Sequence, residues 1–299
     1  MSIKYVPKEL PITENANVTR RHPLTNFIYL LSSVVIVSGI IFIALGYTAS
    51  WLATKISPDN EKRVGDLLYN TIAETEIIDD RRIYYLDELL HDMLDTEENL
   101  RLPLTIHLLD TDIVNAAIMP GGHVLINTGL LREVKSENEL AFVLAHELGH
   151  FQNKDPLKSL GRSLVIISAL ATVGIGTSSS SEGLSSIVSW TGELTILHYS
   201  RNQETEADEY GLARVVSHYG HGGHSLDFFN GFKEFEDEEF PQVSQYFTSH
   251  PQNQERIDYL NELAIQQGWD MNGEITPLPD WLHCPDMDEQ QCEDDIFHH

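Results

Sequence analysis

The chain has 299 residues and 41% hydrophobic content, which fits one large folded domain, or one domain with appendages, and excludes a disordered chain. Its net charge is −27 at pH 7, and an acidic body of this kind repels phosphates, so we expect no nucleic-acid partner. Solubility or a salty habitat accounts for the acidity.

The first predicted element is a membrane anchor at residues 27–49, which contain no charged side chain. A helix of about 20 residues crosses the hydrocarbon layer of a bilayer. Arg20 and Arg21 precede the stretch, and Trp51 lies beyond it, where aromatic rings favour the interface. A cleavable signal peptide is the competing interpretation, but its apolar core is normally shorter. The basic flank predicts a cytoplasmic N-terminal segment (1–26) and export of the acidic body.

Residues 58–99 are predicted to form charged helices that wrap the core. One of them carries an apolar stripe at Leu86, Leu89, Leu90, Met93 and Leu94. Residues 102–110 are rich in apolar and β-branched side chains, which indicates a strand. Residues 113–127 are predicted to form a strand, a turn and a second strand, because Pro-Gly-Gly at 120–122 is a turn signal. A short helix follows.

The stretch 139–153 is predicted to form the central helix. Its apolar residues recur at helical spacing, at Leu140, Val143, Leu144 and Leu148. His146 and His150 are four residues apart, so both imidazoles leave the same face of the helix. Glu147 directly follows the first histidine. In this H-E-x-x-H pattern two histidines hold zinc, and the glutamate acts as general base on a zinc-bound water.

The flanks of this helix carry further signals. Ser136 and Glu139 are predicted to form a capping box at its start, and small Gly149 would let another element approach closely. Residues 163–176 are predicted to form a buried or surface-lying helix, which leads into a serine-rich loop (178–181) that could cover the site. A segment that enters the membrane is the alternative interpretation of 163–176, although it is short for a span.

A catalytic zinc site usually has three protein ligands, and residues 200–216 are the best region for the third. They are predicted to form a helix on which Glu204 and Asp208 face the same way. One carboxylate can bind the metal while the other orients a histidine or moves protons. Ala207 is small, which suits close contact between helices. Taken alone, this segment favours a solvated, charged helix, because Glu206 and Glu209 lie on it too.

Together these motifs resemble the HtpX-like and CAAX-prenyl-protease-like zinc metallopeptidases. The resemblance covers about residues 60–265, and it rests on motifs in the family's order: Asn115…Pro120-Gly121-Gly122, Gly129-Leu130-Leu131, His146-Glu147-x-x-His150, Arg201-x-x-Glu204-x-x-Ala207-Asp208 and Ser249-His250-Pro251…Arg256-Ile257. It implies one Zn²⁺ per chain, bound by His146, His150 and Glu204. It also implies Glu147 as general base and Asp208 as a proton donor or a carboxylate supporting a ligand.

His250 is a candidate donor for the oxyanion of the reaction, with Arg256 as a supporting charge. There are two alternative roles for His250. It could bind zinc as the fourth ligand in a resting state, or it could simply begin a helix. Substrate binding is expected on an edge strand around 115–119, where backbone hydrogen bonds would hold an extended peptide regardless of its side chains. The residues expected to contact this peptide are Asn115, Ala116 and Ala117.

Three histidines lie in the glycine-rich segment 218–224, for which a solvated loop is favoured over a second metal site. Cys284 and Cys292 lie in the acidic C-terminal segment, where a disulfide and two free thiols are both compatible with the spacing.

The expected fold class is α+β and mostly helical. It comprises a zincin-like metallopeptidase domain, with a small sheet whose edge strand flanks the active-site helix, and one N-terminal transmembrane helix. The predicted boundaries are 1–26 for the cytoplasmic segment, 27–49 for the anchor, 58–268 for the peptidase domain and 269–299 for the acidic tail.

The expected function is zinc-dependent endopeptidase activity on unfolded or damaged proteins, some of them membrane-associated, in membrane or envelope quality control. The alternative is a chaperone or assembly factor of the same fold that binds extended polypeptide with little cleavage. One clear span distinguishes this chain from the multi-span HtpX pattern. We therefore expect a single-pass protein of the inner membrane that contacts lipid through residues 27–49, with its catalytic domain on the periplasmic side.

Overall fold

A computed structural model describes residues 23–71, 75–94, 100–172, 199–231, 246, 250 and 254–283. The chain divides into two units, residues 1–45 and 46–299, and each is considered by itself. Some segments named above lie outside the described residues: the serine-rich loop at 178–181, Ser249, Pro251, and both cysteines.

Helix α1 (Pro23–Ala53) contains the predicted anchor and extends past both of its ends. It has 31 residues, and its most apolar stretch of 18 residues has a mean hydropathy of 2.6 and buries nothing within the protein. Since a helix rises about 1.5 Å per residue, α1 is long enough to cross a hydrocarbon layer of about 30 Å. Among the described residues it is the one helix with the length and composition to do so.

The sheet of the second unit has four strands in the order β1-β2-β4-β3. They are β1 (Glu76–Ile77), β2 (Thr105–Leu109), β3 (Ala116–Ile118) and β4 (His123–Asn127). Strands β2 and β4 are parallel, whereas β1 and β3 pair antiparallel with their neighbours. The predicted strands at 102–110 and 113–127 are thus present in shorter form. The short strand β1 was not predicted, because pairing with a partner about 30 residues away leaves no local pattern.

A tight turn joins β3 to β4, as the Pro-Gly-Gly sequence predicts. Gly121 and Gly122 adopt φ angles of 89° and 87°, which side chains with a Cβ rarely tolerate. The amide of Met119 donates to the carbonyl of His123 (2.8 Å), which closes the turn. Because hydrogen-bonded positions alternate in an antiparallel pair, Ala116 and Ile118 direct their backbone groups to the outer edge of the sheet.

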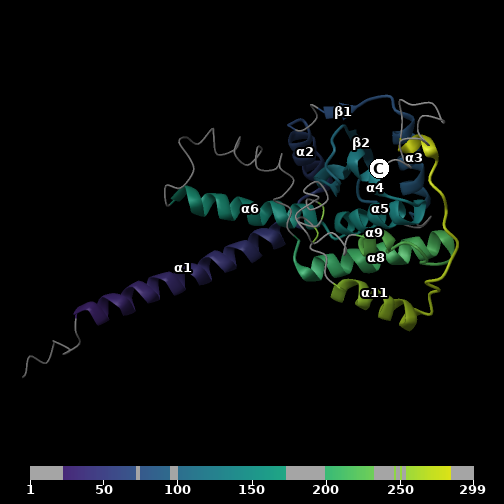
Figure 1. The fold of residues 1–299 in the computed structure, drawn as a ribbon. Coiled ribbons are helices and arrows are strands. Elements are labelled where there is room, and N and C mark those ends of the chain that lie inside the picture. Colours follow the sequence, from purple (N-terminus) through teal and green to yellow (C-terminus); the bar gives the residue numbers. More distant parts are fainter. Residues whose placement is uncertain are drawn as a thin grey trace, which may run out of the picture. The chain divides into compact units, whose positions relative to one another are not determined.

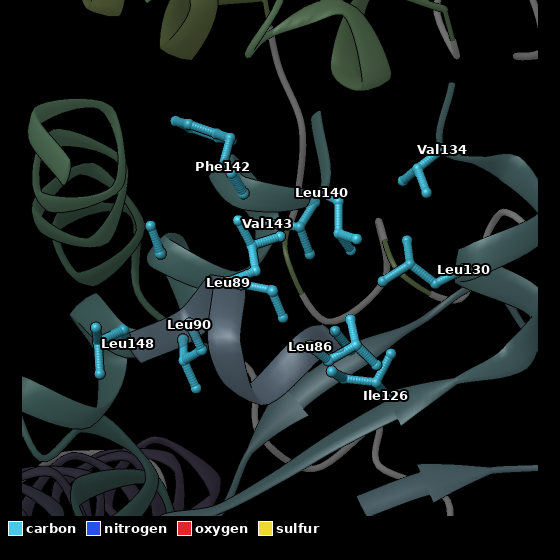
Figure 2. Close-up of a cluster of buried hydrophobic side chains, with 14 of the residues drawn as sticks. Leu86, Leu89, Leu90, Ile126, Leu130, Val134, Leu140, Phe142, Val143 and Leu148 are labelled. Carbon is cyan, nitrogen blue, oxygen red and sulfur yellow. The ribbon is translucent and has the colours of Figure 1, made fainter. Parts of the chain in front are cut away.

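Alternating side chains divide the sheet into two faces. One face joins the main core, in which α3 (Arg81–Asp92) and α5 (Glu137–Gln152) pack together (Figure 2). Its strand residues are Ile106, Leu108, Ala116, Ile118, Val124 and Ile126. The other face packs against α2 (Pro58–Tyr69), through Leu109, Met119 and Leu125 of the sheet and Leu68 of the helix.

Helix α5 is buried along its whole length from Asn138 to Phe151 rather than on one face alone. Ser136 caps it by accepting a hydrogen bond from the amide of Glu139 (3.2 Å). The carboxylate of Glu139 accepts from the amide of Lys135 (2.8 Å) and not from that of Ser136, so only half of the predicted capping box forms. Two helices follow α5 along the chain, α6 (Asp155–Thr172) and α8 (Arg201–Tyr219).

The remaining described elements complete the body. They are α4 (Thr128–Glu133), α9 (Asp227–Gly231), α11 (Gln254–Gln267) and the 3-10 turns η2 (Pro120–Gly122) and η4 (Asp280–Leu282). The amide of Glu137 donates to the carbonyl of Thr276 (2.9 Å), and Leu282 is fully buried. The packed body therefore extends past residue 268, the end predicted for the peptidase domain.

Helices α5 and α8 cross in close contact, and α11 packs on α8 (Figure 1). At the crossing of α5 and α8, a Cβ added to Gly149 would lie 2.9 Å from the Cα of Ala207. We expect Gly149→Ala to lower the free energy of unfolding by about 1–3 kcal/mol in a urea titration, because backbone atoms must move apart. Gly46→Ala is the matched control, since its added methyl group meets nothing within 4 Å. Equal stability of both variants would contradict this account of the crossing.

Candidate metal centre

Four buried side chains converge where α5 meets α8. They are His146 and His150 from α5, Glu204 from α8, and His250 from the segment before α11. One ligand atom from each lies within 4.8 Å of the others, so the group could hold a metal ion. The i,i+4 spacing on α5 puts both of its histidines on one side, and the close helix crossing brings Glu204 opposite them.

The spacing of the donor atoms fits a small tetrahedral cation. Nε2 of His146 lies 3.1 Å from Nε2 of His150 and 3.2 Å from Nδ1 of His250. Oε1 of Glu204 lies 3.4 Å from both His150 Nε2 and His250 Nδ1. Bonds of about 2.0–2.1 Å around a tetrahedral ion place neighbouring ligand atoms about 3.3–3.4 Å apart. Nitrogen and carboxylate donors at these separations suit zinc-like divalent ions.

The charge around the group also favours a cation. Four carboxylates are buried there, those of Glu147, Asp155, Glu204 and Asp208. Among the described residues, Arg256 pairs with Glu204 and Asp208, and Lys158 pairs with Asp155, so acidic groups outnumber basic ones. Burial alone would lower the pKa of the His150 imidazole, but the hydrogen bonds to Asp155 and Glu204 raise it to about 9. Uncompensated buried charge is costly, so the centre requires positive charge, which a divalent ion supplies.

Carboxylates outside the group orient the two histidines of α5. Asp208 Oδ1 lies 2.9 Å from His146 Nδ1, and Asp155 Oδ2 lies 3.0 Å from His150 Nδ1. Each contact uses the outer ring nitrogen and leaves Nε2 directed inward, which is the arrangement that fixes metal-binding histidines. Asp155 was not among the predicted site residues. It follows His150 by five residues and begins the next helix, so no helical spacing links the two.

Arg256 of α11 joins the two carboxylates of α8. Its guanidinium donates two hydrogen bonds of 2.7 Å to Asp208 and lies 2.9 Å from Oε2 of Glu204. Burial alone would raise the pKa of Asp208, but His146 and Arg256 hold it below its ordinary value. Asp208 therefore stays ionised between its two partners. Arg256, expected as a supporting charge for His250, instead contacts the carboxylates of α8.

Glu147 lies between the metal-ligand group and the edge strand. Its Oε2 accepts a hydrogen bond from the amide of Ile118 in β3 (3.1 Å). Its Oε1 lies 3.3 Å from Nε2 of His250. The carboxylate thus contacts both the outer edge of the sheet and a fourth side chain of the group.

Two tyrosines cover the histidines. Tyr199 stacks on His150 with ring centroids 3.9 Å apart, and Tyr246 stacks on His250 at 5.0 Å. Both tyrosines are buried, and burial raises their pKa well above the ordinary value, so they remain neutral at physiological pH. Tyr199 gave no sequence signal, because it lies far along the chain from His150. Tyr246 lies four residues before His250, and the amide of His250 donates to its carbonyl (2.9 Å).

The other predicted site residues lie as follows. Asn115 is buried just before β3, and Ala116 and Ala117 are the first residues of that strand. His218 lies on α8, and the histidines of 218–224 do not form a group that could hold a metal ion within the described part of the chain.

A metal-ligand group on an H-E-x-x-H helix, beside the edge of a small sheet, defines the metallopeptidase class. Residues 81–264 match the peptidase family M48. The chain belongs to this family, which confirms the resemblance drawn from its motifs.

Several named relatives share part of the chain. A putative beta-barrel assembly-enhancing protease of Vibrio cholerae is 30% identical over 139 residues, which are 44% of this chain and 29% of that protein. The mitochondrial metalloendopeptidase OMA1 of Homo sapiens is 26% identical over 203 residues, which are 62% of this chain and 38% of the OMA1 chain. The beta-barrel assembly-enhancing protease of Yersinia pestis is 25% identical over 169 residues, which are 52% of this chain and 34% of that protein. The chain thus spans well under half the length of these relatives.

Proposed function

We propose that this chain is a zinc-dependent endopeptidase that hydrolyses peptide bonds of unfolded or damaged proteins. The observation that carries the proposal is the position of Glu147, which lies between the metal-ligand group and the edge of β3. A peptide paired with that edge would pass beside both the general base and the metal. The M48 family and the relatives, named as proteases or metalloendopeptidases, support the same chemistry.

The proposed roles follow from the contacts. When bound by His146, His150 and Glu204, zinc would lower the pKa of a water ligand and polarise a peptide carbonyl. Glu147 would take a proton from the attacking water and pass it to the leaving amine. Asp208 would hold the ring of His146 in place through Nδ1. This makes Asp208 a positioning residue, not the proton donor that was its other predicted role.

His250 supplies a fourth donor to the group, which supports the resting-state ligand over the oxyanion donor. Structural zinc sites have four protein ligands, whereas catalytic sites keep one position for water. We therefore propose that His250 must leave the group before substrate is cleaved. Movement of one side chain would then control whether the enzyme is active.

Replacing His250 separates the two roles. If His250 blocks the fourth position, His250→Ala should raise the rate of casein cleavage at saturating zinc, by about tenfold if one molecule in ten is otherwise open. Loss of an oxyanion donor would instead lower kcat by about 10²–10³-fold. His224→Ala, which removes a half-exposed histidine paired with Asp227, is the control and should change neither rate nor zinc content.

Substrate would bind by adding a strand to β3. Backbone groups of Ala116 and Ile118 face the outer edge, and such pairing depends little on side-chain identity. This favours unfolded chains as substrates, in accord with membrane or envelope quality control. The side chain of Ala116 is buried in the main core, so only the backbone groups of this residue would contact the peptide.

Helix α1 would anchor the enzyme, and the basic residues Arg20 and Arg21 favour a cytoplasmic position for its N-terminal end. The body would then lie on the periplasmic side of the inner membrane. Protease added from that side should digest the body, and protection of the body would refute this orientation.

The function is tested by digestion of casein and of a reduced, unfolded protein with the purified full chain in detergent. Cleavage should stop with a chelator and return with zinc. Binding of unfolded chains without cleavage in the presence of zinc would overturn the peptidase assignment in favour of a chaperone.

A further inference from the structure

A second group of titratable side chains lies on the face of the sheet that α2 covers. His107 of β2 and His123 of β4 are both buried, and the ring of Tyr69 lies over them at centroid distances of 4.0 and 5.0 Å. The parallel register pairs Thr105 with His123, which brings His107 diagonally beside it. Within the described residues this group does not meet the geometry of a metal site, so another role is needed.

The two histidines form the middle of a hydrogen-bonded chain between two carboxylates. Glu76 Oε1 lies 2.7 Å from His107 Nδ1, and His107 Nε2 lies 3.0 Å from His123 Nδ1. His123 Nε2 lies 3.0 Å from Asp66 Oδ1. The same oxygen of Asp66 accepts a hydrogen bond from Lys62 (2.7 Å). The row of hydrogen bonds thus runs from β1 through β2 and β4 to α2.

The number of protons in these hydrogen bonds fixes the charge of the two histidines. Ionised carboxylates only accept hydrogen bonds, so each of the three contacts needs one proton from a ring nitrogen. Two neutral imidazoles carry only two protons. Three protons on four nitrogens require one imidazolium and one neutral ring.

The ring of His123 favours its neutral form. Burial and the neighbouring positive charge of His107 lower the pKa of His123, although Asp66 opposes this. The pKa of Glu76 is also lowered: burial alone would raise it, but its hydrogen bonds with Tyr69 and His107 outweigh that. One nitrogen of the contact between the two rings therefore donates and the other accepts, while the outer nitrogens donate to Glu76 and Asp66. The charged and titratable groups that face the pair are Glu76 from β1 and Lys62, Asp66 and Tyr69 from α2.

The hydrogen-bonded row of His107 and His123 is connected to β3, which Glu147 contacts, through the turn between β3 and β4. His123 is the first residue of β4, and its carbonyl accepts the hydrogen bond from Met119 that closes the turn. Its ring also lies close to Gly121 within the turn. One residue before Met119, the amide of Ile118 donates to Glu147. A displaced His123 ring would therefore disturb the strand that the general base contacts.

We propose that His107 and His123 are positioning residues that hold β3 in place for substrate while they share one extra proton, and that a second proton on the pair releases it. The proposal rests on the proposed peptidase function. A second proton would put an N–H of His123 against an N–H of His107 at 3.0 Å and add a second positive charge. That contact is repulsive, so the turn would loosen and substrate affinity would fall in acid.

The lowered pKa of His123 determines whether stability rises or falls with pH. The folded protein binds fewer protons at this ring than the unfolded chain does, so the contribution of His123 to stability is fully present at pH values above the unfolded histidine pKa. That stability is lost as the pH falls toward the folded pKa of His123.

Nitrogen NMR of the full chain in detergent, with ¹⁵N-labelled histidine, tests the proton count directly. His107→Gln and His123→Gln assign the signals. At pH 7.5 we expect three protons on the four ring nitrogens of the pair, with the two nitrogens that face Glu76 and Asp66 both protonated. Two neutral rings, or two imidazolium rings, would overturn the proposal.

The kinetic test compares KM and kcat for casein cleavage from pH 5 to pH 8 at saturating zinc. For the wild type, KM should rise by up to about tenfold per pH unit below the second protonation. His123→Gln keeps a donor for Asp66 but does not titrate, so this rise should disappear. His91→Gln is the matched control, because His91 is an exposed histidine paired with Asp87.

Equal acid dependence of KM in the wild type and His123→Gln would overturn the positioning role. If His123→Gln does not fold, Asp66→Asn replaces it. Asp66 raises the pKa of His123, so its loss should move the rise in KM to lower pH, and an unmoved profile would refute the role. If the zinc-loaded chain cleaves nothing at any pH, the proposed function and the kinetic role fail together, while NMR still decides the proton count.

Discussion

Glu147→Gln is expected to lower kcat for casein cleavage by about 10²–10⁴-fold, because an amide cannot accept the proton of the attacking water. The fold and the metal should be retained. Gln has the same shape, and its amide oxygen can still accept the hydrogen bond from Ile118. Glu147 is also not among the four side chains that could hold the ion. Initial rates and the zinc content of the same preparation measure the two effects separately.

The matched control for this variant is Glu206→Gln. Glu206 is exposed on α8, one position before Ala207, so the same chemical change there should leave the rate unchanged. A Glu147→Gln protein that cleaves casein at the wild-type rate would remove Glu147 from the reaction. A variant that is inactive because it has lost its zinc would place Glu147 in metal binding instead.

Glu204→Ala is expected to lower the affinity for zinc by at least about a hundredfold, since residues that only support ligands already contribute 10–100-fold. It removes the carboxylate that lies within 3.4 Å of both His150 and His250, and with it one of the two carboxylates of α8 that Arg256 contacts. Metal analysis of freshly isolated protein should show about one zinc per wild-type chain and much less per variant chain. Cleavage should be lost with the metal.

Thermal unfolding gives a readout that does not depend on activity. A ligand that binds only the folded state raises its stability, so a chelator should lower the Tm of the wild type and have little effect on Glu204→Ala. The control is Glu209→Ala, which removes an acidic residue of the same helix that contacts Tyr259. Its Tm should respond to the chelator as the wild type does. A full zinc complement in Glu204→Ala would exclude Glu204 as a ligand.

Much of the site could be predicted from short stretches of sequence. The spacing of His146 and His150 on one helix fixes their common direction wherever that helix lies. The same holds for Glu204 and Asp208, because four residues make about one turn of any α-helix. Pro-Gly-Gly predicted the turn between β3 and β4, since two consecutive positive φ angles exclude most other residues.

Contacts between segments could not be predicted in this way. Strand β1 was missed because its two residues form a strand only through pairing with β2. The full burial of α5 was missed because its polar residues are satisfied by partners from other elements. Asp155 illustrates this: next to Pro156 it is an ordinary residue at a helix start, and its role depends on the ring of His150 lying 3.0 Å away.

By itself the sequence determined the apolar N-terminal helix, the H-E-x-x-H helix with its two inward imidazoles, and the carboxylate pair on a later helix. Each of these is set by the geometry of one continuous segment. Only the tertiary structure decided that His250 joins the metal-ligand group, that Arg256 binds the carboxylates of α8, and that His107 and His123 share a hydrogen-bonded chain. These depend on distances between segments far apart along the chain, which are fixed by the packing of α5, α8, α11 and the sheet in one core.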